Sequence, residues 1–352
     1  MCSTWRTWTD IVTGLSDLGL TFLIFLAGYE LDLRKIRGGP LRLATAGWAI
    51  SLLIALVVAF ALVSSGLVRN TVVVGLALTT TALGTLIPIL RDARVLDSRF
   101  GSLISAIGTV GEFGPIVAVA LLLTNKDPLV TSLLLVAFIG VAVVTVLLAS
   151  RAQPPRMVAV LDRHMESSAQ LPIRVSLLLI VVLVLLAQTL GLDVLLGAFA
   201  AGIVVKLFTA SADSESIRGK LESIGFGFLI PVFFVVSGIQ FDAHVFVEHP
   251  GSLWRVPLFL SLMLLARGVP VLLLYRKELA PALRLPMALF SATGLPLIVV
   301  ITSIATAEGK MVPLNAASLV AAGMLSVLVF PALGLWRMRD AGISDEPQVR
   351  AS

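Results

Sequence analysis

Charged residues are scarce in this chain: they make up 13% of its 352 residues, whereas apolar residues make up 58%. Water-soluble domains carry about a quarter charged residues, so this composition excludes a soluble globular fold. The mean hydropathy of +1.02 agrees with that conclusion. The chain is therefore predicted to be an all-α integral membrane protein that crosses the lipid bilayer several times.

Cysteine and histidine are also nearly absent, with one cysteine and three histidines in the whole chain. The single Cys2 cannot form an internal disulfide and shows no metal-site spacing. The long apolar runs contain no histidine. Because a membrane enzyme needs a catalytic cluster of such residues, the sequence predicts neither an enzyme nor a bound metal or cofactor.

Long apolar runs are abundant instead. A transmembrane helix needs about 20 apolar residues, and eleven runs approach that length. They lie near 12–33, 41–66, 70–90, 98–124, 128–150, 172–191, 194–210, 222–241, 253–275, 283–307 and 313–336. Residues 1–337 are thus predicted to form one transmembrane domain, followed by a short tail at 338–352.

Basic residues alternate between successive loops. The loops "RKIRGGPLR" and "RDARVLDSR" carry several, whereas the loop between them in the chain carries Arg69 alone. Basic loops face the cytoplasm by the positive-inside rule, which places the C-terminal tail there. The same topology explains the net charge of +5 without a nucleic-acid partner.

Two pairs of segments match at one offset. "TFLIFLAGYELD" (21–32) aligns with "PVFFVVSGIQFD" (231–242), and a shift of 210 positions also carries "TALG" (81–84) onto "SATG" (291–294). The aligned glycines of the first pair are Gly28 and Gly238. An odd number of predicted crossings separates the copies, so the copies run in opposite directions.

This pattern predicts an inverted-repeat transporter. The repeats would span about 12–150 and 194–337, with a linker helix at about 172–191.

The repeated elements lie in the middle of two apolar runs, "LALTTTALGTLIPIL" and "LFSATGLPLIVVITSIA". Proline removes a backbone donor and disfavours helix in the residue before it. Unwound backbone inside a bilayer needs protein or a water-filled cavity to satisfy its polar groups. We therefore predict two discontinuous helices around a transport site, broken at Gly84, Pro88, Gly294 and Pro296.

One acidic residue, Glu112, lies inside another apolar run, in "GTVGEFGP" (108–115). A charged side chain at the centre of a membrane helix costs about 3 kcal/mol and usually faces a cavity or an ion path. Gly108, Gly111 and Gly114 favour close approach of another backbone, which would place Glu112 beside the broken helices. A protonated carboxyl hydrogen-bonded to hydroxyls is the structural alternative.

A buried carboxylate can bind a proton or a dehydrated cation but not both at once, and this competition gives antiport. Sodium and potassium prefer oxygen ligands. The hydroxyls predicted to complete the ion shell are those of Thr79, Thr80, Thr81, Ser291 and Thr293.

Four segments together resemble a known family: "DLGLTFLIFLAGYELDLRKIR", "TTTALGTLIPILRDARVLDSRFGSLISAIGTVGEFGPI", "LGLDVLLGAFAAGIVV" and "IGFGFLIPVFFVVSGIQFD". The chain resembles the monovalent cation:proton antiporter-2 family, the Kef-like sodium/hydrogen exchangers. The resemblance implies an inverted-repeat fold with two crossed discontinuous helices, a homodimer in a bacterial plasma membrane, and exchange of Na+ or K+ for protons. Because such proteins have twelve or thirteen spans, it also implies one or two spans before the first run.

The resemblance also implies roles for two positions. Family members commonly carry aspartate where this chain has Glu112, preceded by Asp, Asn or Gln where this chain has Gly111. They also carry Lys or Arg in the run that contains Arg267, near the carboxylate. An arginine does not release its proton, so Arg267 is interpreted as a fixed counter-charge. Capping of carbonyls at a broken helix is a compatible alternative.

Other transporter classes remain as alternatives. A potassium channel is disfavoured because the chain has no "TVGYG"-like filter. A regulated K+ efflux protein of the same fold and a sodium-coupled symporter of related fold stay open. The direction of proton flux relative to the cation distinguishes the symporter from the antiporter.

Overall fold

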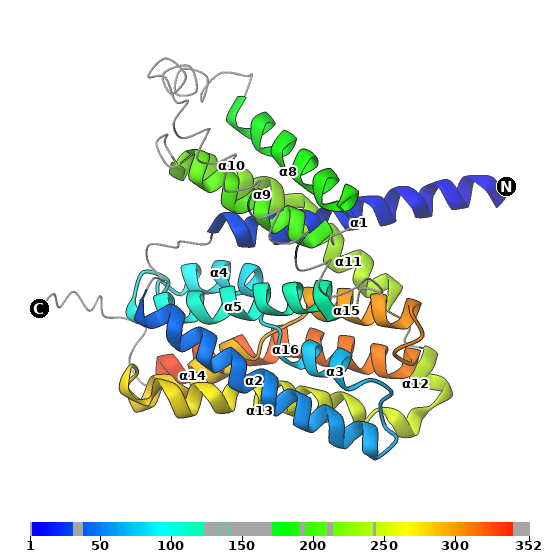
Figure 1. Cartoon of the computed structure of the whole chain (residues 1–352), viewed down its shortest axis with the longest axis vertical. Coiled ribbons are helices and arrows are strands. Elements are labelled where there is room, and N and C mark those ends of the chain that lie inside the picture. The colour runs from blue at the N-terminus through cyan, green and yellow to red at the C-terminus, as the bar shows by residue number, and fades with distance from the viewer. Residues whose placement is uncertain are drawn as a thin grey trace, which may run out of the picture. The chain divides into compact units, whose positions relative to one another are not determined.

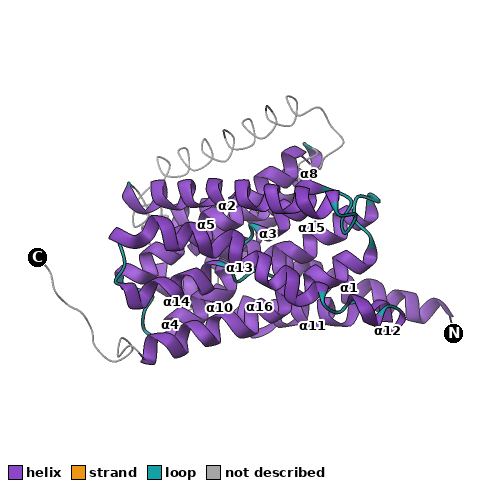
Figure 2. Cartoon of the chain, turned by 90° about the horizontal axis from the view of Figure 1, so that it is seen from below, coloured by secondary structure: helices purple, strands orange, loops and turns teal. Residues whose placement is uncertain are grey.

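The computed structural model describes residues 2–30, 38–122, 171–190, 194–209, 214–241 and 244–340, together with positions 133 and 140. Within these ranges all regular secondary structure is helical (Figure 2). The predicted run near 128–150 lies outside the described residues, apart from the two single positions.

Eight helices of the described chain are long and apolar enough to cross a membrane, by length and composition. They are Ile11–Tyr29, Gly39–Ser64, Thr71–Asp92, Arg99–Val119, Ile217–Ile239, Pro250–Lys277, Pro281–Ala307 and Pro313–Asp340. Two shorter apolar helices, Ile173–Thr189 and Val194–Leu207, match two further predicted runs. The prediction of a polytopic helical membrane protein is confirmed.

The chain divides into two compact units. The first unit combines Met1–Leu31 with Thr124–Gln240, and the second unit combines Asp32–Leu123 with Phe241–Ser352. Each unit therefore draws on both halves of the sequence. The predicted repeats at 12–150 and 194–337 both contribute to both units, so the units are not the repeats themselves.

The first unit is built around α1 (Figure 1). Its elements are α1 (Cys2–Glu30), α8 (Leu171–Thr189), α9 (Val194–Thr209), α10 (Ser214–Ile224), the π-helix η1 (Gly225–Leu229) and α11 (Ile230–Gln240). Helices α1 and α9 meet backbone to backbone, because a Cβ on Gly28 would lie 2.2 Å from the carbonyl oxygen of Phe199. Among the described atoms nothing lies within 4 Å of the same position on Gly238. The two glycines aligned by the repeat thus have different surroundings.

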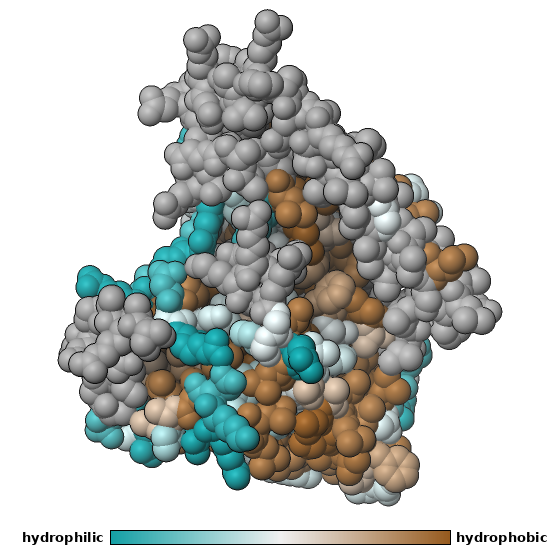
Figure 3. All heavy atoms as spheres, turned by 60° about the vertical axis from the view of Figure 1, so that its left-hand side comes forward, coloured by the Kyte–Doolittle hydropathy of each residue, from teal (hydrophilic) through white to brown (hydrophobic). Residues whose placement is uncertain are grey.

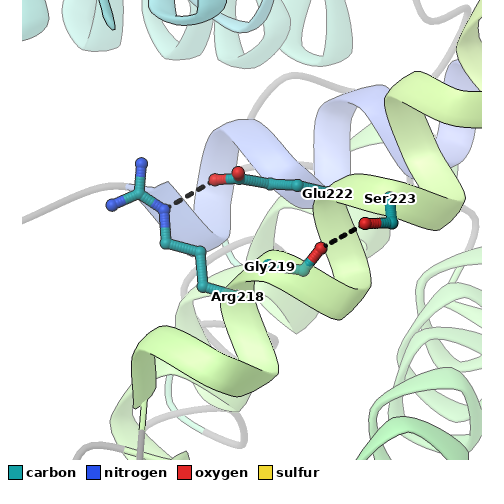
Figure 4. A network of polar contacts seen from close by, with 4 residues as sticks. All are labelled: Arg218, Gly219, Glu222 and Ser223. Carbon is teal, nitrogen blue, oxygen red and sulfur yellow. Dashed lines mark hydrogen bonds and ion pairs between the residues drawn. The ribbon is translucent and has the colours of Figure 1, made fainter.

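Helix α10 is the polar start of a longer helical stretch that continues through η1 into α11. The Nε of Arg218 donates to Oε1 of Glu222 at 2.6 Å, one turn further on, and the hydroxyl of Ser223 donates to the carbonyl of Gly219 at 2.7 Å (Figure 4). The Arg218–Glu222 pair contributes only about 0.5 kcal/mol, and the serine bond to the carbonyl one turn back adds no stability to the helix. They provide α10 with a polar face before the apolar residues of η1 and α11 begin.

The second unit contains the remaining elements. They are α2 (Gly39–Ser64), α3 (Thr71–Leu78), α4 (Leu83–Asp92), α5 (Arg99–Leu122), α12 (His244–Glu248), η2 (Pro250–Ser252), α13 (Arg255–Leu274), η3 (Tyr275–Lys277), α14 (Pro281–Ser291), α15 (Pro296–Ala307) and α16 (Pro313–Asp340). Proline opens α14, α15 and α16, where its missing N–H is not needed. The side chain of Asn70 caps α3 by accepting from the amides of Val72 and Val73 at 2.9 and 3.1 Å.

Small residues hold the helices of the second unit close together. The buried face of α2 consists of Ala44, Gly47, Ser51, Ala55 and Ala59. Between membrane helices the hydrophobic effect is weak, so close packing of such small residues supplies the contact energy. The opposite face of α2 exposes Leu53, Val57 and Phe60 at 64%, 62% and 65%, as expected of a surface that faces lipid.

Basic residues gather at one end of the second unit, where α4, α13 and α16 finish (Figure 1, left). They are Arg91, Arg94, Arg99, Arg276, Lys277, Arg284, Arg337 and Arg339. Figure 3 turns this end forward and shows hydrophilic residues beside a hydrophobic flank. Arg99 pairs with Glu278 there. This arrangement matches the alternation of basic loops in the sequence.

Candidate functional site

Helices α3 and α4 are separated by residues 79–82, which we call the first interruption. The amide of Thr81 donates to the carbonyl of Gly111 in α5 at 3.0 Å, and the amide of Ala82 donates to the carbonyl of Thr293 at 2.8 Å. Because these donors bond to other segments, they do not continue the helix. The break is thus satisfied by protein, as a membrane interior requires.

Helices α14 and α15 are separated by residues 292–295, the second interruption. The hydroxyl of Ser326 in α16 lies 3.1 Å from both the amide nitrogen and the carbonyl oxygen of Gly294. A Cβ on Gly294 would lie 2.8 Å from Oγ1 of Thr80 and 3.1 Å from its carbonyl oxygen. Only glycine therefore lets the second interruption approach the first this closely.

The two interruptions contact each other. Besides the bond from Ala82 to Thr293, the hydroxyl of Thr81 donates to the carbonyl of Ser291 at 2.6 Å. In Figure 1 the chain passes from α3 to α4 toward the left and from α14 to α15 toward the right. Two discontinuous helices of opposite direction thus meet at their centres.

The predicted positions of the breaks need one correction. Gly294 lies in the second interruption and Pro296 is the first residue of α15, but Gly84 and Pro88 lie inside α4. The amide that Pro88 lacks would have bonded to the carbonyl of Gly84, so proline removes only one bond and the helix continues. The break occurs earlier because the amides of Thr81 and Ala82 find partners on other segments.

The predicted ligand hydroxyls are all brought together and buried: Thr79, Thr80, Thr81, Ser291 and Thr293 are at most 1% exposed. Thr80 donates to Ala77 at 3.0 Å, Ser291 to Ala288 at 2.8 Å and Thr293 to Leu289 at 3.3 Å. Each of these hydroxyls uses its proton within its own helix end. Its oxygen lone pairs can still serve as acceptors or ligands.

Thr81 is bonded differently. Its oxygen donates to the carbonyl of Ser291 and accepts from Nε and Nη2 of Arg267 at 3.0 and 2.6 Å. A hydroxyl has one proton and two lone pairs, and all three are used here. In this conformation Thr81 therefore joins Arg267 to the last residue of α14 and has no lone pair left for an ion.

Arg267 lies in α13, is 3% exposed and reaches four neighbouring segments. In addition to Thr81, its guanidinium donates to the carbonyls of Ser291 and Ile107, both at 3.3 Å, and more weakly to the hydroxyl of Ser51 at 3.5 Å. Ser291 is the last residue of α14. A positive charge at that position complements the negative end of the helix dipole.

Glu112 lies in α5 and is 2% exposed. Gly108 precedes it by one turn on the same face, and a Cβ on Gly108 would lie 2.7 Å from the side chain of Leu83, the first residue of α4. Helical side chains lean over the preceding turn, so we expect Glu112 to lean toward the start of α4. The positive end of that helix dipole favours a carboxylate there.

The nearest neighbours of the three glycines of α5 are side chains, whereas the sequence pattern predicts another backbone. At Gly111 a backbone also approaches, because its carbonyl accepts from the amide of Thr81 at 3.0 Å. A Cβ on Gly108, Gly111 or Gly114 would come within 2.7 Å of Leu83, of Arg267 and Thr81, or of Trp48, respectively. The helix that carries Glu112 is therefore pressed against the first interruption.

Two buried hydroxyls that support the site were missed in the sequence: Ser51 and Ser326, which are 1% and 0% exposed. A usable signal existed for Ser51, because it continues the row of small residues at four-residue spacing in α2. Ser326 follows Gly323 by three residues in α16. A hydroxyl within a small-residue face of a membrane helix favours a contact between helices.

Contacting interrupted helices with an ionisable residue beside them are typical of secondary transporters. The family described as the transmembrane sodium/hydrogen exchanger matches residues 3–336. The chain therefore belongs to the sodium/hydrogen exchanger family.

Individual relatives agree with that assignment. The chain is 29% identical over 276 residues to the putative Na+/H+ antiporter YjbQ of Bacillus subtilis, a match that covers 74% of this chain and 44% of YjbQ. It is 28% identical over 249 residues to the high-affinity Na+/H+ antiporter NhaS3 of Synechocystis, covering 67% of this chain and 51% of NhaS3. The chain thus spans about half the length of these curated relatives.

A solved structure shares the fold. The sodium proton antiporter MjNhaP1 from Methanocaldococcus jannaschii at pH 8 superimposes with a TM-score of 0.67 over 96% of this chain and 87% of that chain. The sequence identity is 21%, so this likeness concerns the helical architecture alone.

Proposed function

We propose that this chain exchanges Na+ for H+ across a membrane by antiport, with Glu112 as the group that both ions bind in turn. The observation that carries the proposal is the burial of this carboxyl, 2% exposed, in the helix packed against the first interruption. Membership of the sodium/hydrogen exchanger family supports the choice of ions.

The mechanism follows from the cost of a buried charge. An ionised carboxylate inside a protein needs a neutralising partner, which a proton or a partly dehydrated cation can supply. The two exclude each other at one carboxylate, so loading of one ion on one side of the membrane follows release of the other. No cofactor beyond the transported ions is needed.

The oxygen ligands would come from both interruptions. Thr80, Ser291 and Thr293 keep free lone pairs next to the crossing and suit Na+, a hard cation. Thr81 would enter the ion shell only after Arg267 releases its hydroxyl. Arg267 keeps its charge throughout and acts as the fixed counter-charge of the site.

We extend the proposal to the architecture. The bond from Thr81 to Ser291 joins residues 210 apart, the offset of the sequence repeat, which supports two inverted repeats. The basic end of the second unit supports a cytoplasmic C-terminus. The proposal also includes eleven spans, which rest on the apolar runs of the sequence. A homodimer, a bacterial plasma membrane and the Kef-like group complete it and rest on the sequence resemblance.

The test is ion-driven proton flux in proteoliposomes. A pH gradient is imposed, and NaCl, KCl, LiCl or choline chloride is added. We expect Na+ but not choline to collapse the gradient, and the KM for Na+ to rise as the pH falls because protons compete. The K+ and Li+ arms measure selectivity.

The decisive variant is Glu112→Gln, which keeps the shape but removes the charge. Its Na+-driven proton flux should fall to background. Retention of more than about a tenth of the original flux contradicts the proposal, because it corresponds to a barrier change below about 1.4 kcal/mol. Glu308→Gln is the matched control, since Glu308 pairs with Lys310 at the surface and its loss should leave flux unchanged. Equal responses to Na+ and choline would refute antiport itself.

A further inference from the structure

Gly111 differs from the other two glycines of α5 in the kind of group that lies beside its Cα atom. A Cβ on Gly108 would meet the apolar side chain of Leu83, and one on Gly114 would meet the ring of Trp48. A Cβ on Gly111 would lie 2.6 Å from Nη2 of Arg267 and 2.6 Å from Oγ1 of Thr81. The space beside residue 111 is thus filled by a charged group from another helix.

Neither neighbour can easily give way. Nη2 of Arg267 is held by the hydroxyl of Thr81 at 2.6 Å and by the carbonyl of Ile107 at 3.3 Å. Thr81 is held through its amide by the carbonyl of Gly111 at 3.0 Å and through its hydroxyl by Ser291 at 2.6 Å. A methyl group at position 111 must therefore displace the guanidinium, the first interruption, or both.

We propose that Gly111 is a positioning residue of the exchanger: by having no side chain, it lets the guanidinium of Arg267 occupy the place that a side chain of residue 111 would take. The positive charge beside position 111 of α5 is then supplied by another helix, α13. This inference rests on the proposed function, because it concerns how the ion site around Glu112 is held.

The placement has a chemical consequence. The guanidinium is a permanent positive charge, and from this position it bonds to the first interruption, to α5 and to the end of α14 at once. If a side chain at 111 pushes it away, the bonds of the guanidinium to Thr81, Ile107 and Ser291 are lost together. Cation binding should change along with stability, because the fixed charge moves relative to Glu112.

The test is a double-mutant cycle between Gly111→Ala and Arg267→Lys. Lysine keeps the charge but has no Nη2, so in the lysine background the alanine methyl no longer meets the guanidinium and still meets Thr81. We expect Gly111→Ala to lower Na+-driven flux per folded protein and to shift the KM for Na+, each by about fivefold or more when Arg267 is present. In the Arg267→Lys background the effect of the same change should be at least about twofold smaller, because the contact with Thr81 remains but the contact with the guanidinium is gone.

Gly114→Ala is the control. Its methyl meets Trp48 instead of Arg267, so Arg267→Lys should not relieve its effect. Equal effects of Gly111→Ala in both backgrounds, or equal relief for Gly114→Ala, overturn the proposal.

A double-mutant cycle on thermal stability tests the inference independently of transport. The midpoint of thermal unfolding in detergent is measured for the same variants, and Arg267→Met replaces Arg267→Lys if the lysine variant does not fold. Loss of the wild-type Na+ response refutes the proposed function, whereas the stability cycle still decides whether Gly111 and Arg267 are coupled. Additive shifts in the midpoint overturn the positioning role even where Na+ flux is intact.

Discussion

The two helix interruptions are built from similar residues but are held in different ways. In the first, two amides bond to backbone carbonyls of other segments, and the hydroxyl of Thr81 accepts two hydrogen bonds from a buried guanidinium. In the second, the amide of Gly294 donates to the neutral hydroxyl of Ser326, whose one proton is shared between the carbonyls of Gly294 and Gly323. The charge of the site is thus concentrated on one side of the crossing.

This difference matters because hydrogen bonds to charged groups contribute about 1.5–3 kcal/mol, whereas neutral ones contribute about 1 kcal/mol. The first interruption should therefore tolerate substitution less than the second. It also lies against the helix of Glu112, so substitutions in the first interruption should also change the rate of ion exchange. The two interruptions therefore differ in the strength of the hydrogen bonds that hold them, although their sequences match.

Removal of the charge should have the largest effect. Arg267→Ala removes the charged donor that the carbonyls of Ser291 and Ile107 and the hydroxyl of Thr81 share, and should lower the free energy of unfolding by about 3 kcal/mol. Denaturant titration in detergent measures it. Arg276→Ala is the control, because Arg276 is exposed and bonds to Leu272 within its own chain segment, and it should stay within about 0.5 kcal/mol. Similar losses for both arginines would contradict a special role for Arg267.

Removal of one hydroxyl from the first interruption should have the next largest effect. Thr81→Val preserves shape but leaves the guanidinium without its shortest contact, so we expect a loss of about 2 kcal/mol. Thr302→Val is the matched control, since Thr302 is also buried and donates to Ile298 of its own helix at 2.8 Å. If the two variants unfold at the same denaturant concentration, the hydroxyl of Thr81 is not part of a charged network.

The equivalent change at the second interruption should be milder. Ser326→Ala removes a neutral hydroxyl from Gly294 and should lower the free energy of unfolding by about 1 kcal/mol. Ser318→Ala in the same helix, whose hydroxyl bonds to Leu314 at 2.7 Å, should cost less than about 0.5 kcal/mol. A loss at Ser326 as large as that at Thr81 would remove the asymmetry between the interruptions.

The membrane potential should have the smallest effect on the exchange rate. An insensitive rate would indicate that the charge at the first interruption stays constant during exchange. Residue 111 has no titratable group and Arg267 does not release its proton, so under the proposed function we expect one proton to exchange for one Na+ at Glu112. Any net charge moved would couple to the potential by about 2.3 kcal/mol per 100 mV. Exchange rates are compared with and without a potential clamped by valinomycin, and a change beyond about twofold contradicts electroneutral exchange.

Much of the fold could be predicted from residue type and order. Length and apolarity are local properties, so the predicted runs match ten apolar helices of the described chain. The rarity of ionisable residues in those runs singled out Glu112 and Arg267, because each is expensive in a membrane. The glycines of α5 indicated close packing for the same local reason.

Partners distant in the sequence decided the rest. Proline suggested a break at Pro88, but the break lies at residues 79–82 because Thr81 and Ala82 find carbonyls on α5 and on the second interruption. Only the folded chain brings Arg267 to the space beside Gly111 and uses all three bonding positions of the Thr81 hydroxyl. A sequence determines which groups need hydrogen-bond partners, and the tertiary structure decides which partners they obtain, because those partners lie tens to hundreds of residues away.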